Sequence, residues 1–171
     1  GRLNAAERGT AAHAALRYLD LTKTGSQAEL QGELTRLTYA GYLTPREAKS
    51  VDAATLAGLF ASPIGQRILA ADEVKREFPF TLLCRADSLF PGAGEEEILL
   101  QGVIDCCIRE GDTLTLLDYK TDGVSADTAP RRAERYRGQL EAYAMAMERI
   151  TGLPVREKIL CFLHCGAIIP L

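Results

Sequence analysis

Two different periodicities of apolar residues divide the chain into a helical part and an extended part. Within the first 71 residues, Leu30, Leu34 and Leu37 recur at the spacing that places side chains on one face of a helix. Helix start signals occur at three places: Ser26–Glu29, Thr44–Glu47 and Ser62-Pro63. This part is therefore expected to consist of helices that each bury one face.

From about Val74 onward the pattern becomes that of strands. Extended segments are predicted at 74–84, 97–109, 113–121, 155–163 and 167–170, with turn residues at Pro91–Gly94 and Glu110–Asp112. One long helix is predicted at about 130–150, with Asp127 or Thr128 as its N-cap and Gly152 and Pro154 at its end. The chain is therefore predicted to be a single α/β domain over residues 1–171, with a helical part at 1–72 and a mixed β-sheet flanked by helices at 73–171.

Composition restricts the class of protein without choosing a function. A chain of 171 residues with 47% hydrophobic and 25% charged residues is sufficient for one packed domain. The net charge of −3 would not attract nucleic acid, so a DNA substrate would need a metal ion, a local basic stripe or neighbouring domains. Five cysteines without metal-binding spacing are interpreted as small core residues in a reducing compartment. The chain starts with Gly1, neither Met nor a signal peptide, which favours a segment of a longer chain.

Two aspartates are predicted to face each other across a hairpin. With Gly111-Asp112 as a two-residue loop, Glu110 faces Thr113, and the same register places Asp105 opposite Asp118 with Cβ atoms ~4.5–5.5 Å apart. Two carboxylates ~5 Å apart repel each other by ~3 kcal/mol at an effective dielectric constant of 20. Lys120 shares their face because side chains alternate along a strand.

Two interpretations of these charges remain open. They are either edge-strand charges that face solvent, or ligands of a divalent cation with a lysine beside it. Val103, Leu114 and Leu116 are expected on the same face, which favours a covered position. Mg²⁺ in proteins takes one or two carboxylates, and such an ion supports phosphodiester hydrolysis while Lys120 orients the attacking water or stabilises negative charge. The catalytic residues expected are Asp105, Asp118 and Lys120.

Asp105 and Asp118-Tyr119-Lys120 resemble the PD-(D/E)xK nuclease signature in its Asp-x-Lys form. Three further motifs extend the resemblance over nearly the whole chain: Gly9–His13, Arg76–Phe80 and Tyr136–Tyr143. Together they resemble the RecB-type nuclease family, in particular the AddA-type nuclease domains of bacterial helicase–nucleases. The resemblance implies a restriction-endonuclease-like fold.

The resemblance also assigns a metal-ligand set. It implies that His13 binds the ion together with Asp105, Asp118 and the backbone carbonyl of Tyr119. From spacing alone, His13 is also compatible with a hydrogen-bonded core histidine. Glu77 is implied to lie near the metal or to support Lys120, and the alternative is a surface charge.

A helix is expected to carry residues that contact DNA. The resemblance implies that Gln139 and Tyr143 contact DNA near the scissile phosphate, with Tyr136 on the same helix face; a packing stripe is the alternative. Arg135 belongs to a local basic stripe that could contact phosphates, although charge runs are usually solvated faces. The stripe also contains Arg131, Arg132 and Arg137.

The function that the resemblance implies is a Mg²⁺-dependent exonuclease of single-stranded DNA that acts in repair of double-strand breaks, with Mn²⁺ able to substitute. The implied partners are a helicase motor in the same chain and a second protein of the AddB type, in the bacterial cytoplasm and without a membrane. The cysteines do not match the iron–sulfur arrangement of some relatives, so no cluster is expected. No Gly-x-x-x-x-Gly-Lys-Ser/Thr motif occurs, so ATPase activity is not expected in this segment. The alternatives are a metal phosphodiesterase with another substrate and a non-catalytic DNA-end-binding or scaffold domain.

Overall fold

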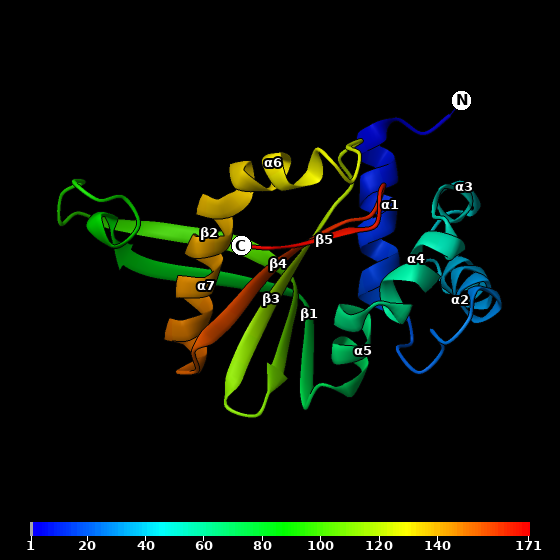
Figure 1. Cartoon of the computed structure of the whole chain (residues 1–171), viewed down its shortest axis with the longest axis horizontal. Helices are drawn as coiled ribbons and strands as arrows, with labels where there is room; N and C mark the ends of the chain where they lie inside the picture. The colour runs from blue at the N-terminus through cyan, green and yellow to red at the C-terminus, as the bar shows by residue number, and fades with distance from the viewer. Residues whose placement is uncertain (1) are drawn as a thin grey trace.

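The computed structural model describes residues 2–171 (Figure 1). Five helices come first: α1 (Ala5–Tyr18), α2 (Gln27–Tyr39), α3 (Pro45–Ser50), α4 (Ala53–Ala61) and α5 (Pro63–Ala70). The remaining elements are β1 (Glu73–Arg85), η1 (Ala86–Ser88), β2 (Glu97–Glu110), β3 (Thr113–Lys120), α6 (Ala129–Ala133), η2 (Glu134–Tyr136), α7 (Arg137–Thr151), β4 (Val155–Phe162) and β5 (Ala167–Pro170). This order of helices and strands confirms the predicted α/β class.

The five strands form one mixed sheet in the order β1-β2-β3-β4-β5. The β3–β4 pair is parallel and the other three pairs are antiparallel. The β2–β3 ladder begins at Glu110 opposite Thr113 and keeps this register to Cys106 opposite Leu117. The predicted hairpin register is thus confirmed up to the residue pair that precedes the two aspartates.

Helices cover both faces of the sheet. One core cluster joins helices α1 to α5 to one face, through side chains such as Cys106, Leu117 and Tyr119. On the other face, α7 packs on Cys107 and Leu116, and α6 packs near Phe162. Cys106 and Cys107 therefore point to opposite faces, as predicted. All five cysteines are free thiols, and four of them are buried.

The helix starts were predicted better than the long helix. Ser26, Thr44 and Ser62 are the N-caps of α2, α3 and α5. The single helix predicted at about 130–150 is wrong, because the chain there consists of α6, η2 and α7. Helix α6 packs in the cluster with Phe162, and α7 contributes Leu140 to that cluster and Ala144 and Met147 to the cluster on β2 and β3.

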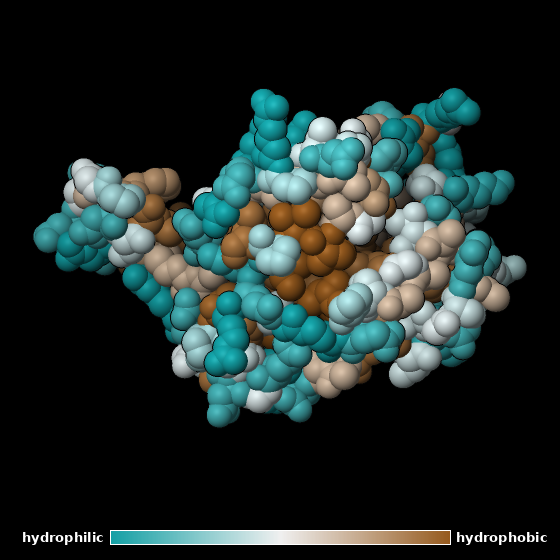
Figure 2. Space-filling model, in the orientation of Figure 1, coloured by the Kyte–Doolittle hydropathy of each residue, from teal (hydrophilic) through white to brown (hydrophobic). Residues whose placement is uncertain are grey.

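The β1–β2 pair extends beyond the other strands as a two-stranded ribbon, seen at the left of Figure 1. Figure 2 shows an apolar area near the centre of the same view, over the C-terminal strands, where Ile168 and Ile169 are half-buried. Among the described residues, no helix combines the length and apolar character needed to cross a membrane.

Candidate metal centre and active site

A paired irregularity in β1 and β2 forms the floor of the site. Arg76 pairs with Cys106 and Phe78 pairs with Ile104, but Glu77 and Asp105 between them are unpaired. Cys106 packs on the α1 side of the sheet and Ile104 on the α7 side, although residues two apart in a strand normally share a face. Because both strands are irregular at the same level, their register is unchanged.

The backbone of Glu77 is strained. Its φ is +49°, and it is the one non-glycine residue with positive φ in the described part of the chain. An L-residue in this region costs about 1–2 kcal/mol, and such strain often occurs at functional sites. This strained position in β1 places the Glu77 carboxylate near His13 of α1 and Asp105 of β2.

We expect Glu77→Gly to be more stable than Glu77→Ala, although both variants lose the carboxylate. Glycine adopts positive φ without a steric penalty, while alanine keeps the strain, so the free energies of unfolding should differ by about 1 kcal/mol. Urea denaturation of the two variants measures this difference. A glycine variant less stable than the alanine variant would show that the backbone at position 77 is not strained.

Three side chains from three elements form a candidate cation site. His13 Nδ1 lies 3.4 Å from Asp105 Oδ1 and 3.8 Å from Glu77 Oε1. One ligand atom from each of these residues can be chosen so that all three lie within 4.8 Å of one another. Ligands on opposite sides of an octahedral Mg²⁺ are about 4.2 Å apart, so this spacing is close to that of a bound ion.

The electrostatics of the site also fit a divalent cation. The hydrogen bond with Asp105 raises the pKa of His13. Burial, followed by the charge of Asp105, raises the pKa of Glu77 and raises that of Asp118 to about 6. Crowded carboxylates with raised pKa values are what a cation would stabilise.

Asp118 lies beside the His13–Glu77–Asp105 group but is not a member of it. The β2–β3 ladder ends before the Asp105–Asp118 level, and Asp105 Oδ2 instead accepts a hydrogen bond from the backbone N–H of Tyr119 at 2.8 Å. The Tyr119 side chain is buried on the α1 side. The two aspartates are near enough for the charge of Asp105 to raise the pKa of Asp118. The carbonyl of Tyr119 as a ligand stays a prediction.

The amine of Lys120 is held by three groups. Its Nζ lies 2.7 Å from Asp118 Oδ2, donates to Gln139 Oε1 at 3.2 Å and lies 4.1 Å from the centre of the Tyr136 ring. This ion pair confirms that Asp118 and Lys120 share a face. Gln139 Nε2 donates in turn to the Tyr143 hydroxyl at 3.1 Å, so the structure brings all five residues together.

The prediction that Val103 shares a covered face with Leu114 and Leu116 is wrong. Leu114 and Leu116 are buried as expected, but Val103 is 44% exposed. The irregularity at Asp105 reverses the alternation of β2, so Ile104 rather than Val103 packs on the α7 side with Leu116. The expected apolar cover therefore does not include Val103.

Arg135 lies apart from the group that surrounds Lys120. It is exposed in η2, and it forms no ion pair within residues 2–171. The neighbouring Arg132 pairs with Asp122 at 2.9 Å, and Asp122 also accepts from the Tyr136 hydroxyl at 2.9 Å. Asp122 is a site residue that the sequence analysis missed.

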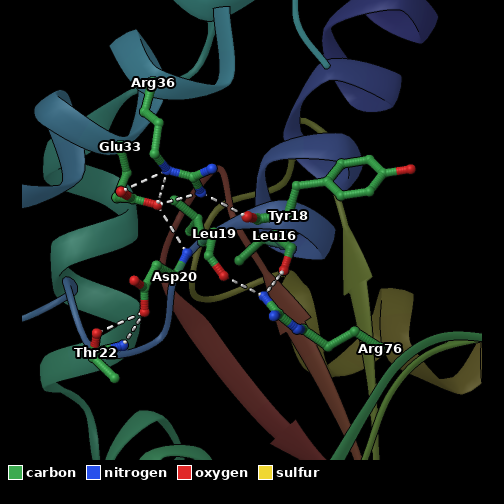
Figure 3. Close-up of polar contacts among 8 residues, drawn as sticks. All are labelled: Leu16, Tyr18, Leu19, Asp20, Thr22, Glu33, Arg36 and Arg76. Carbon is green, nitrogen blue, oxygen red and sulfur yellow. Dashed lines mark hydrogen bonds and ion pairs between the residues drawn. The ribbon is translucent and has the colours of Figure 1, made fainter. Parts of the chain in front are cut away.

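An arginine next to the strained glutamate fixes helix α1 on the sheet (Figure 3). Arg76 Nη1 donates to the carbonyls of Leu19 at 2.6 Å and Leu16 at 3.2 Å, at the C-terminal end of α1. These carbonyls have no partner within the helix, and a cation at this end stabilises the helix dipole. Arg76 thereby connects the strand that carries Glu77 to the helix that carries His13.

A second arginine holds the same end of α1 from the side of α2 (Figure 3). Glu33 is 2% exposed, accepts from the backbone N–H of Asp20 at 2.8 Å and pairs with Arg36 at 2.7 Å. Arg36 Nη2 also donates to the Tyr18 carbonyl at 3.0 Å. The sequence analysis named Arg76 only as part of a motif and did not predict the contact of either arginine with α1, because such contacts join distant segments.

Comparisons with known proteins agree with this geometry. Residues 1–166 match the model of the PD-(D/E)XK nuclease superfamily. The chain is 39% identical over 98% of its length to the AddA-type subunit of the ATP-dependent helicase/nuclease of Desulforamulus reducens. It is 40% identical over 93% to that of Desulforudis audaxviator, and 37% identical over 98% to that of Bacillus cytotoxicus. It spans 13–14% of the length of these relatives.

The match covers both the helical part with His13 and the sheet with Asp105, Asp118 and Lys120. These positions lie together in the structure, so the sequence match and the geometry describe the same site. The chain therefore belongs to the PD-(D/E)XK nuclease superfamily and is homologous to part of the AddA-type subunit of ATP-dependent helicase/nucleases.

Proposed function

We propose that this domain hydrolyses phosphodiester bonds of single-stranded DNA with Mg²⁺ as cofactor and Mn²⁺ as a substitute. The observation that carries the proposal is the His13–Glu77–Asp105 group next to the ordered amine of Lys120. A cation-binding site alone would be compatible with many functions. A cation-binding site with an ordered lysine beside it favours the attack of water on a phosphate ester.

His13, Glu77 and Asp105 would hold the cation, and Asp118 would contribute a carboxylate oxygen while its Oδ2 pairs with Lys120. When bound, the cation lowers the pKa of water and neutralises negative charge on the phosphate. Glu77 extends the ligand set that the sequence resemblance implied, in which Glu77 was placed near the metal or in support of Lys120.

Lys120 would orient the attacking water and stabilise negative charge that develops on the phosphate. Its contacts with Asp118, Gln139 and Tyr136 restrict the amine to one region before substrate arrives. A pre-oriented donor lowers the barrier because it needs no reorganisation during the reaction. Gln139 and Tyr143 would contact the strand on the α7 side of Lys120.

The relatives of this chain suggest in which larger protein the domain acts. These helicase/nuclease proteins are about seven times longer than this chain. We propose that a helicase part of such a chain, together with a second protein of the AddB type, supplies single strands from broken DNA ends, and that this domain acts on them as an exonuclease. A bacterial cytoplasmic location is consistent with this role.

The experiment that tests this proposal is cleavage of an end-labelled single-stranded oligonucleotide by the 171-residue chain. We expect cleavage with Mg²⁺ or Mn²⁺ and none with EDTA, followed on denaturing gels. Shortening from one end would support an exonuclease. Binding of DNA without cleavage at saturating metal would contradict the proposal and favour a non-catalytic DNA-end-binding domain.

A further inference from the structure

A cleft on the α6 side of the site contains three arginines. It encloses about 480 Å³ between the chain segment after β3 and the α6–η2 turn. Its polar lining comes from Ser125, Thr128, Arg131, Arg132 and Arg135. Three guanidinium groups in one cleft are a local exception in a chain whose net charge is −3.

Two of these arginines are available to a ligand. Arg132 pairs with Asp122, but Arg131 and Arg135 are exposed and form no ion pair within the described part of the chain. Guanidinium groups bind phosphate oxygens with paired, charge-assisted hydrogen bonds. The described residues that line this cleft include no aromatic side chain on which a base could stack.

A chain of side-chain contacts connects the cleft to the candidate active site. Asp122 Oδ2 accepts from both Arg132 in the cleft and the Tyr136 hydroxyl, each at 2.9 Å. The ring face of Tyr136 lies on the other side, 4.1 Å from Lys120 Nζ. A strand with one phosphate at Lys120 would therefore pass the cleft with a nearby phosphate.

We propose that this arginine cleft binds a backbone phosphate of the DNA strand, close to the phosphate that is cleaved. This inference rests on the proposed function, because it places the strand of that reaction. Arg131 and Arg135 contact the phosphate, and Arg132 keeps its place through Asp122. Since only the backbone is bound, recognition in the cleft is independent of base sequence.

The test is binding of a fluorescein-labelled oligothymidine to the Arg131→Gln/Arg135→Gln double variant in EDTA, by fluorescence anisotropy at several salt concentrations. Each lost phosphate contact should make the slope of log affinity against log salt concentration shallower by about 0.7. The affinity lost by the variant should therefore be about fivefold greater at 0.1 M salt than at 1 M salt. The matched control is Arg46→Gln/Arg156→Gln. It removes two exposed arginines of α3 and β4 that form no ion pair among residues 2–171, and so changes the net charge equally.

A weaker affinity and a shallower slope for the cleft variant alone would support the proposal. Equal effects in both variants, or none in either, would overturn it. As a second measurement, single neutral methylphosphonate linkages are placed along the oligonucleotide. A methylphosphonate at one particular position should weaken binding of the oligonucleotide to the parent chain but not to the cleft variant.

This design separates the two proposals. If the parent chain binds DNA through the cleft but does not cleave it, the proposed nuclease function is wrong and the cleft assignment stands. If the parent chain cleaves DNA and the double variant binds like the control, the cleft assignment alone is wrong.

Discussion

Lys120→Ala is expected to lower the rate of DNA cleavage by about 10²–10³-fold, the effect of removing one pre-oriented donor from a transition state. The amine is held in place because it lies 2.7 Å from Asp118 and donates a hydrogen bond to Gln139, and alanine provides no donor at this position. Single-turnover cleavage at saturating Mg²⁺ measures the effect. The change should appear in the rate of the chemical step rather than in DNA affinity.

The control for this prediction is Lys49→Ala, which removes an exposed lysine from α3. It should cleave at the parent rate. Binding of Mn²⁺ to the Lys120 variant should be as tight as to the parent or tighter, because a cation beside the carboxylates has been removed. Equal cleavage by parent and Lys120→Ala would show that the lysine takes no part in the reaction.

Arg76→Met is expected to lower the free energy of unfolding by about 2–3 kcal/mol. The variant keeps the aliphatic stem but leaves the carbonyls of Leu16 and Leu19 without their charged donor. It should also weaken Mn²⁺ binding, although Arg76 is not a ligand, because α1 with His13 is no longer held next to Glu77. Urea denaturation and calorimetric titration of Mn²⁺ measure the two effects.

Arg85→Met is the control, because within residues 2–171 Arg85 forms ion pairs only with Asp87 and Glu95 near the tip of the exposed ribbon. Surface ion pairs contribute about 0–1 kcal/mol, so this variant should be nearly as stable as the parent and bind Mn²⁺ equally. Arg76→Lys keeps a donor and should restore part of the metal affinity. Unchanged Mn²⁺ affinity in folded Arg76→Met would show that the arginine does not position the site.

Local sequence signals were sufficient for the β2–β3 hairpin and for the position of Lys120 beside Asp118. The Gly111-Asp112 loop sets the register, and alternation along β3 places Lys120 beside Asp118. Helical spacing brings Gln139 and Tyr143 together. These relations depend on residues close in sequence or on one turn, which is why they could be predicted.

Other features depend on contacts that a periodicity does not encode. The positive φ of Glu77 breaks the alternation of β1, so simple strand geometry could not place its carboxylate in the candidate metal centre. The same irregularity reverses the expected face of Val103. Arg76 acts across 57 residues on the end of α1, and no short motif marks such a contact.

The most direct test of this account is the position of Mn²⁺ in crystals of the chain soaked with MnCl₂, located by its anomalous scattering. We predict one ion within about 2.5 Å of ligand atoms from His13, Glu77 and Asp105. Bound Mn²⁺ at a different group of residues, or none here at saturating concentration, would contradict the proposed metal centre.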